Sequence, residues 1–366
     1  TRQCLIILCG DLYEYWQLTY VKERPVSLRH VVPTLGALAL VSAAPAIEVG
    51  DLTIGGFVDT VFYFQDSDGS GSTGGDDAIM EFDAEAELQF GYKIGDAVNA
   101  QLDVELDGEA DPSTGSNVGV EQAFVSWAVS DQATLTLGKV ETLVGYEAVD
   151  APDLWRIATS LVDDISPGST TGLNIGFAPS EQVAVDVYIV DGIYDTDSSP
   201  VGSAKLSDDL SFGVSVVFNG PDDKFFVDFD FAVDAGGDPT SPEDDITVFS
   251  LNGEFSGVEK LTIFGDLTQR SVDASDDMGI LVGANYEIDD TKSATVMISM
   301  LDLDAADATQ TEIALALLTN PTGDANFAVN YEISIFDADD AGAANAHLGA
   351  GDDATTFGVE FLAVIP

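Results

Sequence analysis

The stretch from Ala78 to Gly108, AIMEFDAEAELQFGYKIGDAVNAQLDVELDG, decides the fold. From residue 80 to residue 92 every second side chain is apolar, and those between them are acidic or amide up to Gln89. After a short turn at 94–97 the same alternation runs from 98 to 107. This period of two predicts two antiparallel strands joined by a tight turn. About thirteen residues at roughly 3.3 Å each would give a first strand of about 43 Å, or about 33 Å along an axis tilted by about 40°, which exceeds the roughly 25 Å apolar band of an outer-membrane barrel.

Strands of this length are unusual in soluble sheets, where about five or six residues are typical. In a soluble protein the apolar side would pack inward, whereas in a transmembrane barrel it would meet lipid and the acidic side would line a wet lumen. We expect the second arrangement. The carboxylates that we predict to line the pore are Glu81, Asp83, Glu85, Glu87, Asp103, Glu105, Asp107, Asp228 and Asp230.

The rest of the chain alternates long polar loops with short turns, as outer-membrane barrels do with extracellular loops and periplasmic turns. The long acidic loops are expected at 65–77, 108–118, 141–170, 192–202, 234–245, 270–278, 302–310 and 337–353. Eight such loops predict an all-β fold, a single antiparallel barrel of sixteen strands over residues 47–366. Between Gly202 and Asp234 the segments 203–208, 209–219 and 224–233 compete for two strand positions, so eighteen strands are also allowed.

Two further patterns bear on the barrel. The alternating segment from Phe357 to Ile365 can pair with the first strand, 53–64, and close the barrel so that no edge is left bare in lipid. Aromatic residues recur just before short turns, where they would form a periplasmic girdle, although aromatics are also good strand residues in general. The aromatic residues concerned are Phe90, Tyr92, Trp127, Phe177, Phe255 and Tyr286.

The formal charge of the 366-residue chain is −53, from 12 basic and 65 acidic residues. So negative a surface repels nucleic acid and anionic lipid headgroups, which excludes both as expected partners. Adaptation to a salty habitat and a cation-attracting pore both explain the acidity, and the two explanations are compatible.

The N-terminal region reads as targeting sequence. Residues 22–46 combine basic residues, an apolar run and an Ala44-x-Ala46 cleavage pattern, which predicts a secretory signal peptide. Residues 1–21 begin without Met and are interpreted as a non-native extension. Both cysteines, Cys4 and Cys9, fall there, so the mature chain is expected to hold no disulfide or thiolate metal site.

Part of the chain resembles a bacterial porin family, the β-barrel porin-2 or OmpL-like proteins. The residues that carry the resemblance are VEQAFVSW at 120–127, TLTLGKVETLVGYEAVDAPDLW at 134–155 and TTGLNIGFAPSEQVAVDVYIVDG at 170–192. The resemblance implies a solute-uptake channel in the outer membrane of a Gram-negative-type bacterium. Leu154 departs from the polar residue expected there, and the low basic content prevents any transfer of ion preference.

Residues 141–170 are too apolar for a freely solvated loop. In large barrels such a segment often folds inward and narrows the pore, and we expect this here, with an external loop packed on its neighbours as the alternative. Basic side chains facing acidic ones would then set a transverse field on passing solutes. The predicted constriction residues are Lys139, Glu141, Glu147, Asp150, Asp153, Trp155 and Arg156.

Evidence for other chemistry is thin. Asp66, Asp68 and Asp77 imitate a calcium loop but lack its closing Glu, so a solvated acidic loop is the default and no metal is assigned. His347 is the sole histidine after residue 46, and no nucleophile or zinc motif accompanies it, so no enzyme and no cofactor is predicted.

The sequence therefore predicts an outer-membrane porin through which small hydrophilic solutes diffuse passively, with cations favoured and a homotrimer as the expected assembly. Its other partner would be outer-membrane lipid. The alternative is a secreted or surface-attached acidic β-protein with a structural or calcium-dependent adhesive role.

Overall fold

The structure, a computed structural model, describes residues 47–67, 79–107, 118–141, 144–148, 150–194, 211–234, 246–272, 275–304, 307–323, 326–339 and 353–365. The predicted signal peptide and N-terminal extension lie outside these residues. The strands are β1 (Ile47–Val49), β2 (Leu52–Ser67), β3 (Ile79–Ile94), β4 (Val98–Asp107), β5 (Gly119–Ser130), β6 (Ala133–Glu141), β7 (Ser169–Ser180), β8 (Val183–Val190), β9 (Ser211–Asn219), β10 (Phe225–Asp234), β11 (Ile246–Val258), β12 (Leu261–Val272), β13 (Ser275–Asp289), β14 (Lys292–Leu303), β15 (Ala308–Thr319), β16 (Phe327–Asp339) and β17 (Asp353–Ile365). Three short 3-10 helices are described, η2 (Ala151–Asp153), η3 (Asp163–Ile165) and η4 (Pro221–Asp223). None of the described helices has the length and apolar character needed to cross a bilayer.

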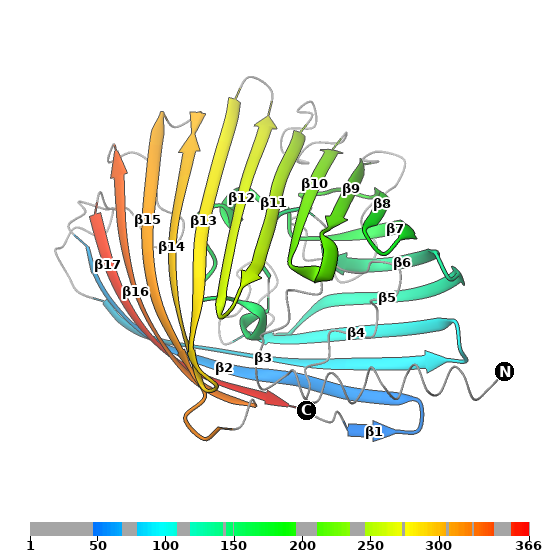
Figure 1. Ribbon diagram of the computed structural model, residues 1–366, viewed down its shortest axis with the longest axis horizontal. Coiled ribbons are helices and arrows are strands. Elements are labelled where there is room, and N and C mark those ends of the chain that lie inside the picture. Colours follow the sequence, from blue (N-terminus) through cyan, green and yellow to red (C-terminus); the bar gives the residue numbers. More distant parts are fainter. Residues whose placement is uncertain are drawn as a thin grey trace.

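Strands β2 to β17 form a closed antiparallel barrel of sixteen strands, as predicted (Figure 1). Each strand pairs with its neighbours in the chain, and β17 pairs with β2 from Ala354↔Ser67 to Ile365↔Gly56 to close the ring. The short strand β1 pairs with Leu52–Ile54 of β2, beyond the point where β17 ends. It therefore extends the ladder along the part of β2 that β17 does not reach.

The apolar face of the strands points away from the barrel interior. Phe82 is 76% exposed and Leu315 is 53% exposed, whereas Glu312 and Glu360 on the opposite face are each 1% exposed. A soluble sheet sandwich would show the reverse, because its apolar side chains would be sealed between layers. The exposed apolar belt is the arrangement that transmembrane barrels show toward lipid.

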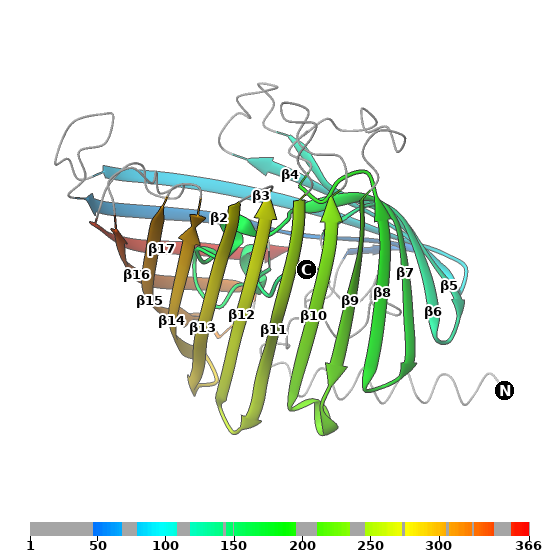
Figure 2. The same ribbon diagram turned by 90° about the horizontal axis from the view of Figure 1, so that it is seen from above.

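The short turns lie along one rim of the barrel (Figure 2). The register places Trp127 opposite Val98, Phe177 opposite Ala133 and Tyr286 opposite Leu261, each next to a short turn. All three aromatic rings are 46% exposed or more on the outer face. The aromatic residues predicted near these turns thus gather outside a single rim.

The ambiguous region between Gly202 and Asp234 resolves into the two strands β9 and β10, joined by a seventh short turn at η4. The competing segment 203–208 lies outside the described residues. The prediction of a long loop at 270–278 is wrong, because β12 and β13 stay paired up to Val272↔Ser275. The residues of this strand extension are polar, and polar residues in sequence indicate a loop. In the structure Arg270 and Asp277 face each other in the ladder and form a 2.7 Å ion pair.

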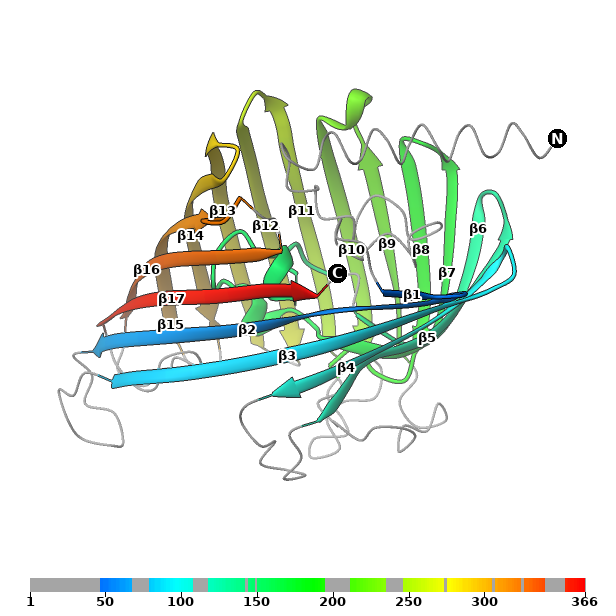
Figure 3. The same ribbon diagram turned by 90° about the horizontal axis from the view of Figure 1, so that it is seen from below.

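The segment between β6 and β7 lies inside the barrel, between the walls formed by β11–β13 and by β2, β3 and β17 (Figure 3). Its side chains pack with interior-facing strand residues into apolar clusters, so the lumen contains a core of its own. We call the described residues of this segment, 144–148 and 150–168, the inner loop.

Candidate pore constriction

The inner loop leaves the wall with a turn at Gly145, whose φ of +99° is strained for any residue with a Cβ. The next backbone amide, that of Tyr146, donates a 2.9 Å hydrogen bond to Asp266 on β12. The Gly145 amide itself donates to Asp230 on β10 at 3.4 Å. Inside a barrel a loop has no ladder to satisfy its amides, so acidic strand residues serve as acceptors.

An aromatic stack fixes the first half of the loop. The Tyr146 ring lies 5.2 Å from the Phe264 ring and the Trp155 ring lies 5.9 Å from it, both nearly parallel. The Trp155 indole N–H donates to the Tyr146 hydroxyl at 2.9 Å, and that hydroxyl donates to Glu254 at 3.1 Å. Trp155 is therefore bound into the loop instead of standing free in the lumen.

Arg156 joins the loop to the wall at β15 and β16. It is 3% exposed and its guanidinium pairs with Glu312 on β15 and, at 3.5 Å, with Glu332 on β16. The same group donates to the carbonyls of Ala158 and Thr159 at 2.6 and 2.7 Å. The guanidinium thus interacts with the wall and the loop backbone, and it does not set a transverse field across the opening.

Glu147 connects the first part of the inner loop to Ser160 in its second part. Its carboxylate accepts from the Ser160 amide at 2.9 Å and from the Ser160 hydroxyl. Burial raises the pKa of Glu147 to about 8, and Asp163 adds to the increase, while Ser160 and the charge of Arg156 oppose it. The docked loop therefore favours the protonated carboxyl at neutral pH.

The second half of the loop packs on β12 to β16. The Ile157 amide donates to Glu332 at 2.8 Å and the Leu161 amide reaches Ser299 on β14 at 3.4 Å. Leu161 and Ile165 are fully buried with Leu301 and Phe336 of the wall. This half of the lumen is consequently closed by apolar contacts.

The opposite wall, β3 to β5, carries most of the predicted pore-lining carboxylates. Glu81 and Asp83 are exposed near the long-loop end of β3, Glu85 and Glu105 are half-buried, and Glu87 and Asp103 are buried. Asp103 accepts hydrogen bonds from Gln101 and Gln122 at 2.7 and 3.0 Å. The backbone of Asp107 ends β4, and its side chain lies outside the described part.

Asp228 and Asp230, which we predict to line the pore, lie on β10. Both are fully buried on β10, where Asp228 accepts from Ser215 at 3.0 Å and Asp230 from Asn252 at 3.1 Å. Asp230 also contacts the loop backbone at Gly145. Asp230 thus lies beneath the inner loop, on the wall that the loop covers.

The remaining predicted constriction residues do not form one group with Arg156. Lys139 lies on β6 and its ammonium donates to the Val120 carbonyl at 2.8 Å. Glu141 ends β6 and accepts from Gln122 at 3.4 Å. Asp153 is exposed on η2, and Asp150, just before η2, lies beside Glu87 and Glu121, the described group of acidic residues that could hold a metal ion.

Sequence reasoning missed the wall residues that bind the loop. They are Glu254, Phe264, Asp266, Ser299, Glu312 and Glu332. Alternation alone places them on the inner face, but in so acidic a chain nothing distinguishes an acceptor for the loop from a residue that lines water. Tyr146 could have been singled out from the sequence, because it lies in one of the segments that carry the family resemblance.

Asp66, at the end of β2, is exposed. Asp68 and Asp77 lie outside the described residues, so the calcium-loop imitation stays a sequence pattern.

Comparison with solved structures identifies porins of the same fold. An anion-selective porin from Comamonas acidovorans matches with a TM-score of 0.63 at 14% identity, covering 86% of this chain and 99% of that one. The outer membrane channel DcaP of Acinetobacter baumannii gives 0.62 at 13% identity, covering 88% and 100%. In-vitro folded OmpT of Vibrio cholerae, in a trimer form, gives 0.55 at 14% identity, covering 87% and 100%.

At these identities the likeness establishes the fold alone. A search of curated protein sequences finds no match. The comparison with protein families does find one, over residues 51–362, which includes strands β2 to β16 and all but the last three residues of β17. The chain belongs to the family described as "Putative beta-barrel porin-2, OmpL-like".

Proposed function

We propose that the protein is a porin of the outer membrane of a Gram-negative-type bacterium, through which small hydrophilic solutes diffuse passively and cations pass more readily than anions. Membership of a porin family makes the chain a channel protein and not an enzyme. The solute range, the ion preference and the assembly are the proposed parts.

One observation carries the cation preference. Among the described residues, Arg156 is the one buried basic side chain, and it is paired with two wall glutamates. Within the described residues, strands β3 to β5 carry no buried basic side chain. Acidic side chains that line a lumen raise the local concentration of cations and lower that of anions.

Four of the described basic residues are instead placed at the short-turn rim. Lys93 lies near the end of β3, and Lys224, Lys260 and Lys292 lie at or beside short turns. These four positive charges therefore lie at one mouth of the barrel. On β3 and β4 the inward-facing acidic residues lie toward the long-loop end, from Glu81 to Glu87 and from Asp103 to Glu105, and amide residues follow toward the short turn.

Buried polar atoms on the inner face support a hydrated lumen. Both carboxylate oxygens of Asp186 and the hydroxyl of Tyr188 have no hydrogen-bond partner among the described residues. Polar groups buried in this way are normally satisfied by water or ions.

The test is the zero-current potential in a planar bilayer under a KCl gradient. Channel steps with a potential that indicates K⁺ over Cl⁻ are expected. Substitution of Glu85 and Glu105 by Gln should reduce the preference, whereas Lys292→Gln, which changes an exposed residue at a short turn, should leave it unchanged. No channel steps would refute the porin, and preference for Cl⁻ would refute the acidic pathway.

The proposed assembly is a homotrimer. It is supported by the fold shared with OmpT of Vibrio cholerae, which is recorded in a trimer form, and by the exposed apolar belt that neighbouring barrels or lipid can cover. Cross-linking in native membranes that gives a three-chain band supports it, and a band of one or two chains contradicts it.

A further inference from the structure

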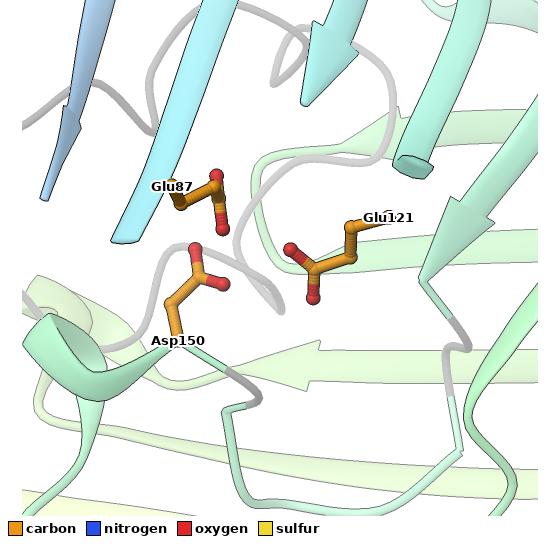
Figure 4. A group of neighbouring side chains, drawn as sticks. All are labelled: Glu87, Glu121 and Asp150. Carbon is orange, nitrogen blue, oxygen red and sulfur yellow. The ribbon is translucent and has the colours of Figure 1, made fainter. Parts of the chain in front are cut away.

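An acidic cluster joins the inner loop to the wall of the barrel away from Arg156. One carboxylate oxygen from each of Glu87 on β3, Glu121 on β5 and Asp150 in the loop lies within 4.8 Å of the others. Figure 4 shows the three carboxylates converging from two strands and from the loop. The members come from three separate places in the chain, so they meet only when the loop is docked.

Glu87 has no partner for its charge within the described structure. The residue is 1% exposed, and neither of its carboxylate oxygens has a hydrogen-bond donor. An ionised carboxylate buried without a partner is strongly unfavourable. The group therefore requires either a proton shared with a neighbour or a cation.

A β-bulge directs Glu121 toward the same point. Gln122 pairs with Asp103 and Val120 pairs with Val104, so Glu121 is an extra residue between two consecutive pairs of the ladder. Without the bulge, alternation would send Glu121 and Gln122 to opposite faces of the sheet. Bulges of this kind re-aim a side chain, often next to a functional site.

We propose that Glu87, Glu121 and Asp150 bind a divalent cation of the calcium class, which ties the inner loop to β3 and β5. All donors in the cluster are oxygen, with no imidazole or thiolate, which favours hard cations over zinc or copper. Two oxygens on one Ca²⁺ lie at most about 5 Å apart, because each sits about 2.3–2.6 Å from the ion. The three oxygens lie within 4.8 Å of one another, which is inside this limit for Ca²⁺. Mg²⁺ usually keeps several waters, so a site of three carboxylates suits Ca²⁺ better.

The test is a calorimetric titration of the folded full-length chain in detergent with CaCl₂ alone. At about 1 M KCl the Debye length is about 3 Å, which suppresses diffuse binding to so acidic a surface. One Ca²⁺ per chain is expected. Glu87→Gln and Asp150→Asn should each weaken its affinity by about tenfold or more, while Glu81→Gln, an exposed carboxylate on the same strand and face, should not.

Heat-modifiable gel migration checks that each variant forms the barrel, and Asp150→Asn lies outside the ladder altogether. Absence of calcium binding by the native chain would overturn the proposal in favour of a shared proton. Equal affinity in Glu87→Gln, or an equal loss in Glu81→Gln, would overturn it in favour of a diffuse counterion cloud.

Channel recordings give a second readout, which rests on the proposed porin function. Added Ca²⁺ should reduce current noise in the native channel and leave Asp150→Asn unaffected, and an equal response in both would contradict tethering of the loop. A chain that binds Ca²⁺ but forms no channel steps would refute the porin and leave the cation site standing.

Discussion

The role of Arg156 as the link between the inner loop and strands β15 and β16 can be tested by replacing it with Met, which keeps an unbranched apolar side chain and removes the guanidinium and its charge. The substitution leaves Glu312 and Glu332 buried, at 1% and 6% exposure, without their cation. It also removes the bonds to the Ala158 and Thr159 carbonyls. The wall itself should persist, because its ladder does not involve Arg156.

Removing one partner of a buried ion pair typically costs about 3–5 kcal/mol. At about 1.4 kcal/mol per tenfold change, the docked loop would lose about two to four orders of magnitude in its equilibrium against an undocked loop, in which both glutamates regain water. The first half of the loop should remain attached, since Tyr146 keeps Asp266 and Glu254. The second half, from Arg156 to Leu161, should become mobile.

Single-channel recording is the appropriate assay. Arg156→Met should raise the mean conductance and add rapid fluctuations, while heat-modifiable migration stays that of a folded barrel. Lys292→Gln is the matched control, because it removes an equal charge from an exposed pair with Asp289 at 3.8 Å, which contributes little. Arg156→Met with Glu312→Leu should recover part of the quiet state, since one uncompensated carboxylate is gone. A folded Arg156→Met channel with native conductance and noise would refute the reasoning.

Three further predictions concern pH, the aromatic stack and the lipid face. The pKa of Glu147 in the docked loop is about 8, above its ordinary value of 4.5, so its contribution to docking is complete below pH 4.5 and is lost as the pH rises through 8. The current noise should therefore increase from pH 6 to pH 9 in the native channel but not in Glu147→Gln, and equal pH responses would contradict this. Trp155→Ala removes a stacked ring and one hydrogen bond, so conductance should rise while the thermal unfolding of the barrel stays near native; an unchanged conductance would show that the stack does not narrow the lumen. Leu315 is 53% exposed on β15, and near the bilayer midplane Leu315→Arg should make folding into lipid vesicles less favourable by about 2–4 kcal/mol relative to the control Leu315→Ala. Equal folding of the two variants would show that this face meets water.

Much of the barrel could be predicted from alternation. The outward parity holds from Phe82 in β3 to Phe361 in β17, and the closing pair of first and last strands is the one expected. The prediction of a loop at 270–278 is wrong because Asp, Ser and Arg in sequence are typical of loops. In the barrel the same side chains pair across a strand extension.

The interior was less predictable. Alternation tells which strand residues face inward, but the inner loop decides which of them meet water. Asp230 and Asp103 stand on equivalent inner positions of their strands, yet Asp230 contacts the loop amide at Gly145 and Asp103 contacts Gln101 and Gln122 of the opposite wall. That difference depends on the path of the loop, which no local pattern encodes.

The position of the loop divides the acidic residues into two sets with separable effects. Asp266 and Glu332 accept hydrogen bonds from loop amides, and Glu312 binds Arg156, so their carboxylates replace the ladder that a loop inside a barrel lacks. Glu85 and Glu105 lie on the opposite wall, where both are half-buried. Neutral substitutions in the first set should therefore change the noise and size of the current, whereas those in the second should change ion preference at nearly constant conductance. The high acidity of the chain would then serve both to position the loop and to select the ions that pass it.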